Sequence, residues 1–158
     1  MSVYMLYHKK NDALKTAEGI TVSFDRVPFL SKKYNGLISN IYWNLISKKV
    51  YVCEVSKDGE TVHYSYVMTK NYKFPFMDDN TFMVGPSYTP KDERGKGYLA
   101  AALDYLSSEV LSMDPKAELV ALIREENVSS RKGFEKGGYE FLGEKYVKNR
   151  LKVYHRYD

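Results

Sequence analysis

The chain has 158 residues, of which 44% are hydrophobic and 28% charged, and this composition is ordinary for a globular protein. Its net charge of +4 comes from interspersed charges, which favours a small anionic ligand over nucleic acid. The single cysteine, Cys53, excludes an intrachain disulfide. No apolar run approaches the ~20 residues of a membrane span, and the first residues do not resemble a signal peptide. We therefore expect a cytoplasmic protein.

The periodicity and turn residues predict alternating strands and helices along the whole chain. In chain order, the expected elements are a strand at 2–7, irregular chain at 9–19, a helical stretch at 29–46, strands at 49–55, 61–69 and 81–88, a helix at 99–113, a strand at 119–123, a helix capped by Asn127 and ending near 136, and two paired strands at 139–147 and 151–157. This order predicts a mixed α/β fold, with a mostly antiparallel central sheet flanked by helices. We find no repeat or linker, so residues 1–158 are expected to form a single domain.

Three local signals refine this order. Leu30, Ile38 and Leu45 lie on the apolar side of the helical pattern at 29–46, which Gly36 weakens. The pair Gly85-Pro86 interrupts its strand and predicts a bulge at that point. The segment 119–123 is wholly apolar, which is typical of a strand in the centre of a sheet.

The most informative motif lies between the strand at 81–88 and the helix that follows. It reads Arg94-Gly95-Lys96-Gly97-Tyr98-Leu99. Glycine allows positive φ and close approach of a ligand to the backbone. The first N–H groups of a helix have no partner within the helix and carry partial positive charge. The motif therefore predicts an anion site, most naturally for phosphate.

Other phosphate and catalytic motifs are missing from the sequence. The glycine spacings of the P-loop and of the dinucleotide-binding fold do not occur. No nucleophile elbow around a serine is present. The three histidines, His8, His63 and His155, are scattered, so we expect no metal site.

A second motif follows the strand at 119–123. It consists of Asn127, Ser130, Lys136, Gly138 and Tyr139. Together with the glycine loop, it resembles the GNAT superfamily of acetyl-CoA-dependent N-acetyltransferases. The two motifs stand in that family's order and spacing, and the strand order from about Val50 onward agrees.

This resemblance implies a function and a site. Acetyl-CoA is the expected co-substrate and lies in a V-shaped gap between the strands at 81–88 and 119–123. The implied cofactor-binding residues are Ser87, Tyr88, Thr89, Arg94, Gly95, Lys96, Gly97, Tyr98, Leu99, Asn127 and Ser130. A small-molecule amine, such as an amino sugar, attacks the thioester directly. Whether the chain forms a homodimer through a sheet edge stays open.

Two positions depart from the family pattern. Leu99 stands where the family has glycine or alanine. Phe134 stands where the family often has a tyrosine that protonates the departing CoA thiolate, and phenylalanine has no proton to give. Phe134 supports the alternative that the chain is a non-catalytic acyl-CoA-binding or regulatory module. A Tyr-rich, mildly basic module that binds nucleic acid or protein is the second alternative.

The attacking amine must lose a proton, so the sequence should supply a base or a water relay. The candidates on predicted strands are Glu54, His63, Tyr64 and Tyr66, and of these we predict Glu54 and His63 as base or water relay. Glu125 and Glu126 lie at a strand end but are more typical of solvated residues. Cys53 lies in an apolar strand and is expected to be a buried structural thiol.

Overall fold

The computed structural model describes residues 1–13 and 17–158. Its elements are β1 (Val3–Lys9), β2 (Thr21–Arg26), α1 (Leu37–Ile46), β3 (Val50–Lys57), β4 (Glu60–Met68), β5 (Thr81–Tyr88), the 3-10 turn η1 (Lys91–Glu93), α2 (Tyr98–Met113), β6 (Glu118–Arg124), α3 (Val128–Lys136), β7 (Tyr139–Lys148) and β8 (Tyr154–Arg156). None of these helices is long and apolar enough to cross a membrane.

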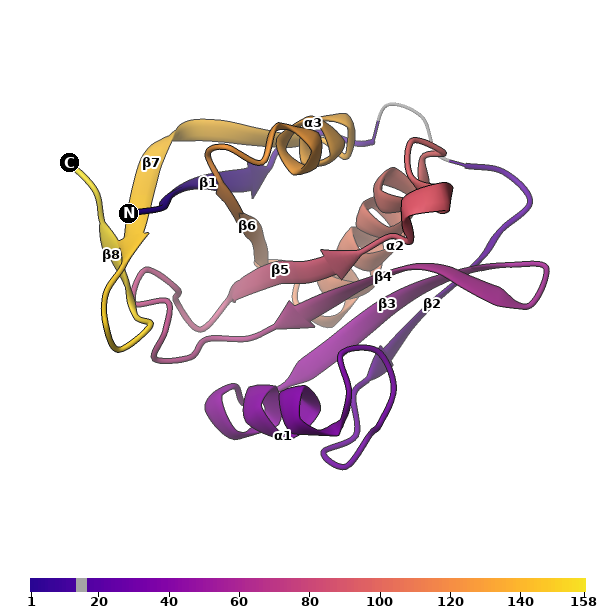
Figure 1. Ribbon diagram of the computed structural model, residues 1–158, viewed down its shortest axis with the longest axis horizontal. Coiled ribbons are helices and arrows are strands. Elements are labelled where there is room, and N and C mark those ends of the chain that lie inside the picture. Colours follow the sequence, from indigo (N-terminus) through magenta and orange to yellow (C-terminus); the bar gives the residue numbers. More distant parts are fainter. Residues whose placement is uncertain (14–16) are drawn as a thin grey trace.

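All eight strands of the described chain form one sheet in the order β2-β3-β4-β5-β6-β1-β7-β8 (Figure 1). Only β5 and β6 run parallel, and the other neighbours are antiparallel. The mixed, mostly antiparallel sheet predicted from the sequence is therefore confirmed. The apolar strand β6 lies inside the sheet, between β5 and β1, as its composition predicted.

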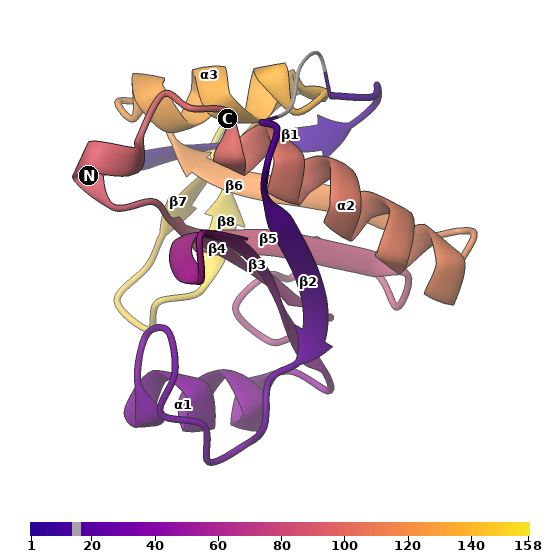
Figure 2. The same cartoon turned by 90° about the vertical axis from the view of Figure 1, so that its right-hand side faces the viewer.

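Helices cover both faces of this sheet. Figure 2 shows α2 and α3 in the upper part of the molecule and α1 at its lower end. Along the central strands, alternate side chains enter two separate cores, because successive residues of a strand point to opposite faces. Met5 and Tyr7 pack with α2 and Phe134 in one core, whereas Tyr4 and Leu6 pack in the other, on the side of α1.

The N-terminal strand β1 is an interior strand of the sheet. It pairs with β6 on one side and β7 on the other, for example through Tyr7 opposite Ala121 and Phe141. Four successive residues at its centre are buried, because both faces of this strand are covered. Chain segments from the two ends of the sequence are thus joined in the middle of the fold (Figure 1).

Two N-terminal elements differ from the expectation. The helix α1 occupies only the second half of the predicted stretch 29–46, because Gly36 at its N-cap has φ of 88° and Tyr34 has φ of 62°, outside the helical region. Strand β2 was not predicted, although Val22 and Phe24 alternate with polar residues and pack inward. Alternation with a period of two residues is typical of a strand, but a strand of only six residues with few apolar ones gives too short a pattern to be recognised.

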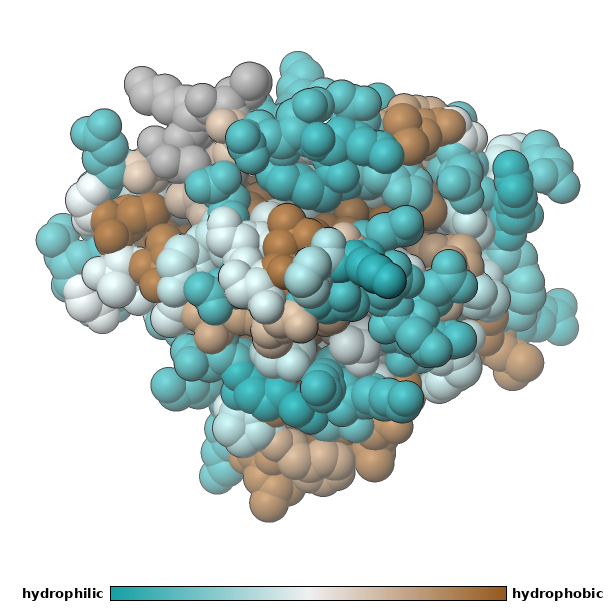
Figure 3. Space-filling view, turned by 180° about the vertical axis from the view of Figure 1, so that it is seen from behind, coloured by the Kyte–Doolittle hydropathy of each residue, from teal (hydrophilic) through white to brown (hydrophobic). Residues whose placement is uncertain are grey.

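The surface at α1 is apolar. Figure 3 shows brown side chains at the lower end of the molecule, where Figure 1 places α1. Ile38 and Leu45 of α1 are 84% and 68% exposed, and Leu30 before it is 69% exposed. The three residues on the apolar side of the predicted helical pattern are therefore exposed: Leu30 precedes α1, and Ile38 and Leu45 lie on its solvent side.

Candidate functional site

The parallel strands β5 and β6 separate after a short common stretch. They pair only from Thr81 opposite Glu118 to Met83 opposite Val120. Beyond Met83, β5 stays with β4, while β6 continues beside β1. The two strand ends therefore splay apart and leave a gap that opens toward the start of α2.

A bulge in β5 contributes to this separation. Ser65 of β4 faces Ser87, and Val67 faces Val84, so Gly85 and Pro86 together oppose a single residue of β4. A bulge bends the strand and increases its twist. The interruption predicted at Gly85-Pro86 is confirmed, and it directs the last residues of β5 away from β6.

The glycine loop lies at the mouth of the gap. Gly95 has φ of 78°, and Gly97 is the N-cap of α2 with φ of 84° and ψ of 11°, the left-handed region. No side chain caps this helix end. Because the first amides of α2 have no partner within the helix, they are available to an anion in front of them.

A cavity of about 520 Å³ joins the gap, the loop and α3. It brings together most of the predicted cofactor-binding residues: Ser87, Tyr88, Thr89, Arg94, Gly95, Gly97, Tyr98, Leu99, Asn127 and Ser130. We call it the β5–α3 cavity. Its volume lies within the range of small-molecule sites.

Lys96 is the predicted residue that does not line the β5–α3 cavity. Its Nζ lies 2.9 Å from a carboxylate oxygen of Glu93, so the side chain turns back onto η1. Arg94 does line the cavity, and its Nε donates a hydrogen bond of 3.0 Å to the carbonyl oxygen of Thr89. The ion pair thus removes one of the two predicted cations from the cavity.

Helix α3 forms the opposite wall. The side chain of Asn127 accepts a hydrogen bond of 3.1 Å from the amide of Ser130 and caps the helix, as predicted. Lys132 and Lys136 also line the cavity. Sequence reasoning named Lys136 as part of the second motif but assigned neither lysine to the cofactor site, although their spacing of one helical turn places them on one side of α3. They make this wall cationic.

The packing of α3 on α2 explains how Leu99 fits where the family has a small residue. A Cβ atom at Gly133 would lie 2.7 Å from Cδ2 of Leu99. A Cβ atom at Gly137 would lie 2.3 Å from Cδ1 of Leu103, one turn further along α2. The two glycines therefore let α3 approach α2 closely, with the leucines filling the space.

Phe134 also faces this cavity and is almost fully buried. It is 4% exposed, and its ring meets the ring of Tyr139 edge to face at 5.2 Å. The position that often carries a tyrosine in the family therefore lies beside the candidate site but presents a hydrocarbon edge.

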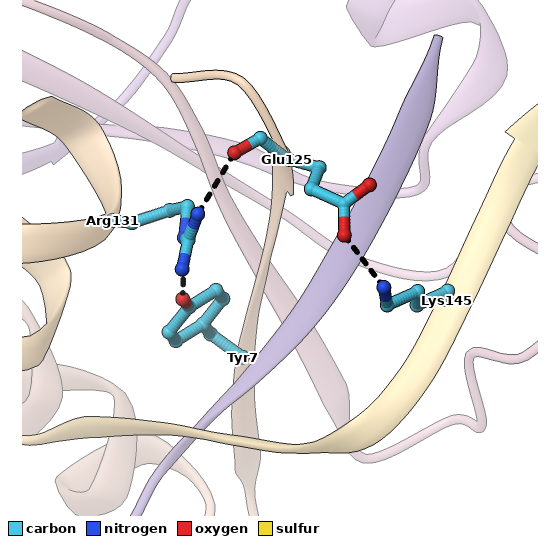
Figure 4. A network of polar contacts seen from close by, with 4 residues as sticks. All are labelled: Tyr7, Glu125, Arg131 and Lys145. Atoms are coloured by element: carbon cyan, nitrogen blue, oxygen red, sulfur yellow. Dashed lines mark hydrogen bonds and ion pairs between the residues drawn. The ribbon is translucent and has the colours of Figure 1, made fainter. Parts of the chain in front are cut away.

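A network of hydrogen bonds and one ion pair holds the segment before α3 in place (Figure 4). Arg131 donates hydrogen bonds of 3.1 Å to the Tyr7 hydroxyl and 2.9 Å to the carbonyl oxygen of Glu125. The Glu125 carboxylate pairs with Lys145 at 2.5 Å. These contacts connect α3, β1 and β7 and position the turn that carries Asn127. Glu125 lines neither this cavity nor the one described next, and neither does Glu126.

A second cavity of about 420 Å³ lies beside the first, against β3, β4 and the end of β5. Its lining residues are Lys33, Tyr34, Glu54, Thr61, His63, Tyr64, Tyr88 and Pro90. His63 and Tyr88 also line the β5–α3 cavity. We call the second space the tyrosine cavity. Both predicted catalytic candidates, Glu54 and His63, line it.

His63 lies at the junction of the two cavities and is only 1% exposed. Its Nδ1 lies 2.7 Å from the Thr89 hydroxyl, and its Nε2 lies 2.7 Å from the Ser65 hydroxyl. Ser65 is in turn 2.7 Å from the Ser87 hydroxyl. Burial lowers the pKa of His63 to about 4, so the ring is neutral near pH 7. A chain of hydroxyl and imidazole groups therefore runs beneath the end of β5.

Glu54 lies on β3 and makes no hydrogen bond to His63, Ser65, Ser87 or Thr89. Burial acts to raise the pKa of its carboxyl, but hydrogen bonds from Tyr34, Thr61 and Ser56 and the charge of Lys33 outweigh that effect. The pKa of Glu54 therefore falls below its ordinary value, and the group is a carboxylate at neutral pH. Such a group binds cations well and is a weak base.

Three further residues considered from the sequence contribute to packing and not to the site. Cys53 is fully buried, and burial raises the pKa of its thiol to about 12, as expected of a structural cysteine. Tyr42 and Trp43 flank the ammonium of Lys73, at 4.9 and 5.0 Å from their ring centres, and do not line the tyrosine cavity. Within residues 1–13 and 17–158, no group of His, Cys, Asp or Glu is placed to hold a metal ion.

The similarity of this chain to other proteins is found in its structure. No protein-family model matches it, and no curated protein matches it by sequence. A tandem GNAT protein from the clavulanic acid biosynthesis pathway superimposes with a TM-score of 0.59 at 13% identity, over 89% of this chain and 50% of that chain. A GNAT-family structure from Novosphingobium aromaticivorans gives 0.58 at 13% identity, over 89% and 60% of the two chains.

An acetyltransferase of the same family from Colwellia psychrerythraea gives a TM-score of 0.56 at 11% identity, over 90% of this chain and 53% of that chain. The splayed mixed sheet with a glycine loop at the start of α2 thus defines an α/β acyltransferase fold. More particularly, the chain has the fold of the GNAT acetyltransferases, as its motifs predicted. It spans between 50% and 60% of the length of these three structures.

Proposed function

We propose that the chain is an acetyl-CoA-dependent N-acetyltransferase. The observation that carries this proposal is the meeting of two chemically different cavities at His63 and Tyr88. One is lined by helix-start amides and cations, which suits the phosphates of CoA. The other is lined by tyrosines and a carboxylate, which suits an amine.

The β5–α3 cavity fits acetyl-CoA in its chemistry. The pyrophosphate would lie at the amides after Gly97, with Arg94, Lys132 and Lys136 supplying positive charge. The exposed polar end of β5 at Ser87 to Thr89 would accept the amides of the pantetheine arm. Lys96 is assigned no contact here, because Glu93 holds it.

The reaction is a direct transfer within a ternary complex, in which proximity supplies much of the rate. The nitrogen of the neutral amine bonds to the thioester carbonyl carbon, an amide of β5 near Tyr88 polarises the carbonyl oxygen, and the carbon–sulfur bond then breaks. The nitrogen loses a proton, and the CoA thiolate gains one from solvent, since Phe134 cannot donate. His63 and the hydroxyls of Thr89, Ser65 and Ser87 would form the relay that carries the proton from the amine to solvent at the exposed Ser87.

The alternative is a non-catalytic acyl-CoA-binding module. Two observations favour it: Phe134 at the position of the usual acid, and the lowered pKa of both base candidates, Glu54 and His63, which makes each a weaker base. In that case the β5–α3 cavity would bind CoA without turnover. We propose a cytoplasmic location in either case, because the one cysteine is buried and unpaired.

The experiment that tests the proposal has two stages. Calorimetric titration with CoA and with acetyl-CoA measures binding, which should also raise the melting temperature, because a ligand of the folded state stabilises it. A thiol-release assay with acetyl-CoA then screens amino sugars, aliphatic amines and peptide amines. Binding without release against every amine would favour the alternative, and absence of binding at millimolar CoA would overturn both.

A further inference from the structure

Glu54, Tyr64 and Tyr88 form a row across the sheet in the tyrosine cavity. Glu54 of β3 lies directly opposite Tyr64 of β4, which lies directly opposite Tyr88 of β5. Directly opposed residues point to the same face of a sheet. Because neighbouring strands lie about 4.8 Å apart, the backbone at Glu54 is about 10 Å from that at Tyr88.

Glu54 carries a negative charge at one end of this row. Its carboxylate accepts hydrogen bonds from the hydroxyls of Tyr34, Thr61 and Ser56. Thr61 and Ser56 both bind Oε1, and Tyr34 binds Oε2. A carboxylate has about four acceptor sites, so Oε2 keeps room for one further donor. Among the described residues, no lysine, arginine or histidine nitrogen lies within 4.0 Å of it. Lys33 lines the same cavity and its charge lowers the pKa of Glu54, but the two groups form no ion pair, so Glu54 can still bind a cation directly.

Aromatic rings continue from Glu54 toward the junction of the cavities. The ring of Tyr64 lies 5.1 Å from that of Tyr34 and 5.7 Å from that of Tyr88, measured between centres. Tyrosine faces attract ammonium groups and accept the methylene chains between them. A path lined by tyrosines therefore leads from the carboxylate to the point where the β5–α3 cavity begins.

The position of Glu54 argues against contact with the reacting nitrogen. An amine that is paired with a carboxylate keeps its proton and is not a nucleophile. The nitrogen that is acetylated must instead lie neutral at the end of β5 near Tyr88, two strands away. A second nitrogen is needed to occupy the carboxylate at the same time.

We infer that the acceptor is an aliphatic diamine, with one ammonium bound by Glu54 and the tyrosines and the other amine directed to the end of β5. This inference rests on the proposed function. The ammonium of an alkylamine has an ordinary pKa near ~10, so the distal group is charged at neutral pH. Its alkyl chain lies along the tyrosine rings.

The test is calorimetric titration of the protein, alone and saturated with CoA, with 1,4-diaminobutane and with n-butylamine. Each probe can place one ammonium on Glu54, but only the diamine then keeps a second amine for the end of β5. Thiol release from acetyl-CoA should therefore show a preference for the diamine, being at least about tenfold faster with it than with n-butylamine at equal occupancy. Equal release with the two probes would overturn the inference.

Variants identify the group that reads the second charge. Glu54→Gln keeps the acceptor oxygen and the shape but removes the charge, and it should abolish the preference for the diamine. Glu60→Gln makes the same chemical change on the exposed tip of the β3–β4 hairpin and should leave the preference intact. Tyr64→Phe keeps the ring and should bind the diamine nearly as the parent does, whereas Tyr64→Leu should bind it several-fold more weakly. A preference that survives Glu54→Gln contradicts the inference.

CoA titration of every variant separates this inference from the proposed function. If CoA binds and the diamine shows no preference, the acetyltransferase proposal stands and the diamine inference fails. If the diamine binds through Glu54 and CoA does not bind, the cation site stands and the acetyltransferase proposal fails. Melting temperatures show that each variant is folded.

Discussion

His63 illustrates how a single buried residue couples the site to stability. Its ring is enclosed between Thr89 and Ser65, and both nitrogens have hydroxyl partners. The folded protein keeps this ring neutral down to a pKa of about 4, against 6.5 for an ordinary histidine. Between these two values the unfolded chain binds the proton and the folded chain does not.

The free energy of unfolding should therefore fall as the pH falls from about 6.5 toward 4. Because each unit of pKa difference corresponds to about 1.4 kcal/mol, His63 should cost about 2 kcal/mol of stability between pH 7 and pH 5. His63→Gln, which can still bond both hydroxyls, should lack this loss. Urea unfolding of both proteins at the two pH values measures the difference. Burial also lowers the pKa of His8, but that contribution is common to both proteins. Equal pH dependence in the two proteins would contradict the assignment.

Phe134 allows the proposed chemistry to be tested at the position of the missing acid. Phe134→Tyr adds a hydroxyl at the cavity wall with little change in volume, so kcat should stay equal or rise. Phe134→Leu loses the edge-to-face contact with Tyr139 and should destabilise the fold by about 1–2 kcal/mol. Its kcat should stay within about tenfold, because no proton transfer is lost and a positioned acid is worth more than that. Both values are measured on the acceptor found by the amine screen.

A larger loss of kcat in Phe134→Leu, with folding and CoA affinity preserved, would mean that the ring positions the substrate. Leu99, which lines the β5–α3 cavity together with Phe134, is also tightly packed, against Gly133. Sequence comparison identified Leu99 as a departure but not its partner, because Gly133 lies on another helix.

Among the elements, the start of α2 carries most of the proposed phosphate binding. Gly97→Val forces a β-branched residue into the left-handed region and places methyl groups before the free amides. We expect CoA binding to fall below detection in calorimetric titration and the fold to survive with a loss of about 1–2 kcal/mol.

Gly143→Val serves as the matched control for Gly97→Val. Gly143 has φ of 97° with open space around its Cβ position, so valine is strained there too. It lies on β7 and lines neither of the two cavities. CoA affinity should stay at the parent value in this variant. A similar loss in both variants would assign the effect to strain in general, and normal CoA binding by Gly97→Val would place the phosphate site elsewhere.

Some elements are determined by residues close together in the sequence, and others are not. Helices α2 and α3 and the apolar strand β6 appear where the sequence predicted them, because caps, glycines and periodicity act within a few residues. Strand β2 and the true start of α1 were missed. The ladder of β2 depends on β3, and the positive φ values at Tyr34 and Gly36 depend on contacts made around that turn.

At the scale of the whole molecule, β1 holds the two parts of the sheet together. It bonds to β6 and β7 at once, and Tyr7 connects to α3 through Arg131 and Glu135. Without it, β6 and β7 would each expose a hydrogen-bonding edge and an apolar face. The wall of the β5–α3 cavity that α3 supplies therefore depends on the first residues of the chain.

Removal of residues 1–9 should abolish cooperative unfolding, measured by circular dichroism during urea denaturation. Removal of residues 155–158, which takes the outer part of the edge strand β8 and keeps Tyr154 against Tyr4 and Phe74, should cost no more than about 2 kcal/mol. A cooperative transition in the first truncation with near-parent stability would show that β6 and β7 associate without β1.

The sequence by itself determined the class of fold, the glycine loop, the cap at Asn127 and the anomaly at Phe134. Each of these follows from backbone conformations and motif spacings that act within a short stretch of chain. Only the tertiary structure placed β1 between β6 and β7, turned Lys96 away onto Glu93 and brought Lys132 and Lys136 to the β5–α3 cavity. It also set Glu54 two strands from Tyr88, the arrangement on which the diamine inference depends. The physical reason is that strand pairing, bulges and side-chain direction depend on neighbours far away along the chain, and these decide which residues share a cavity.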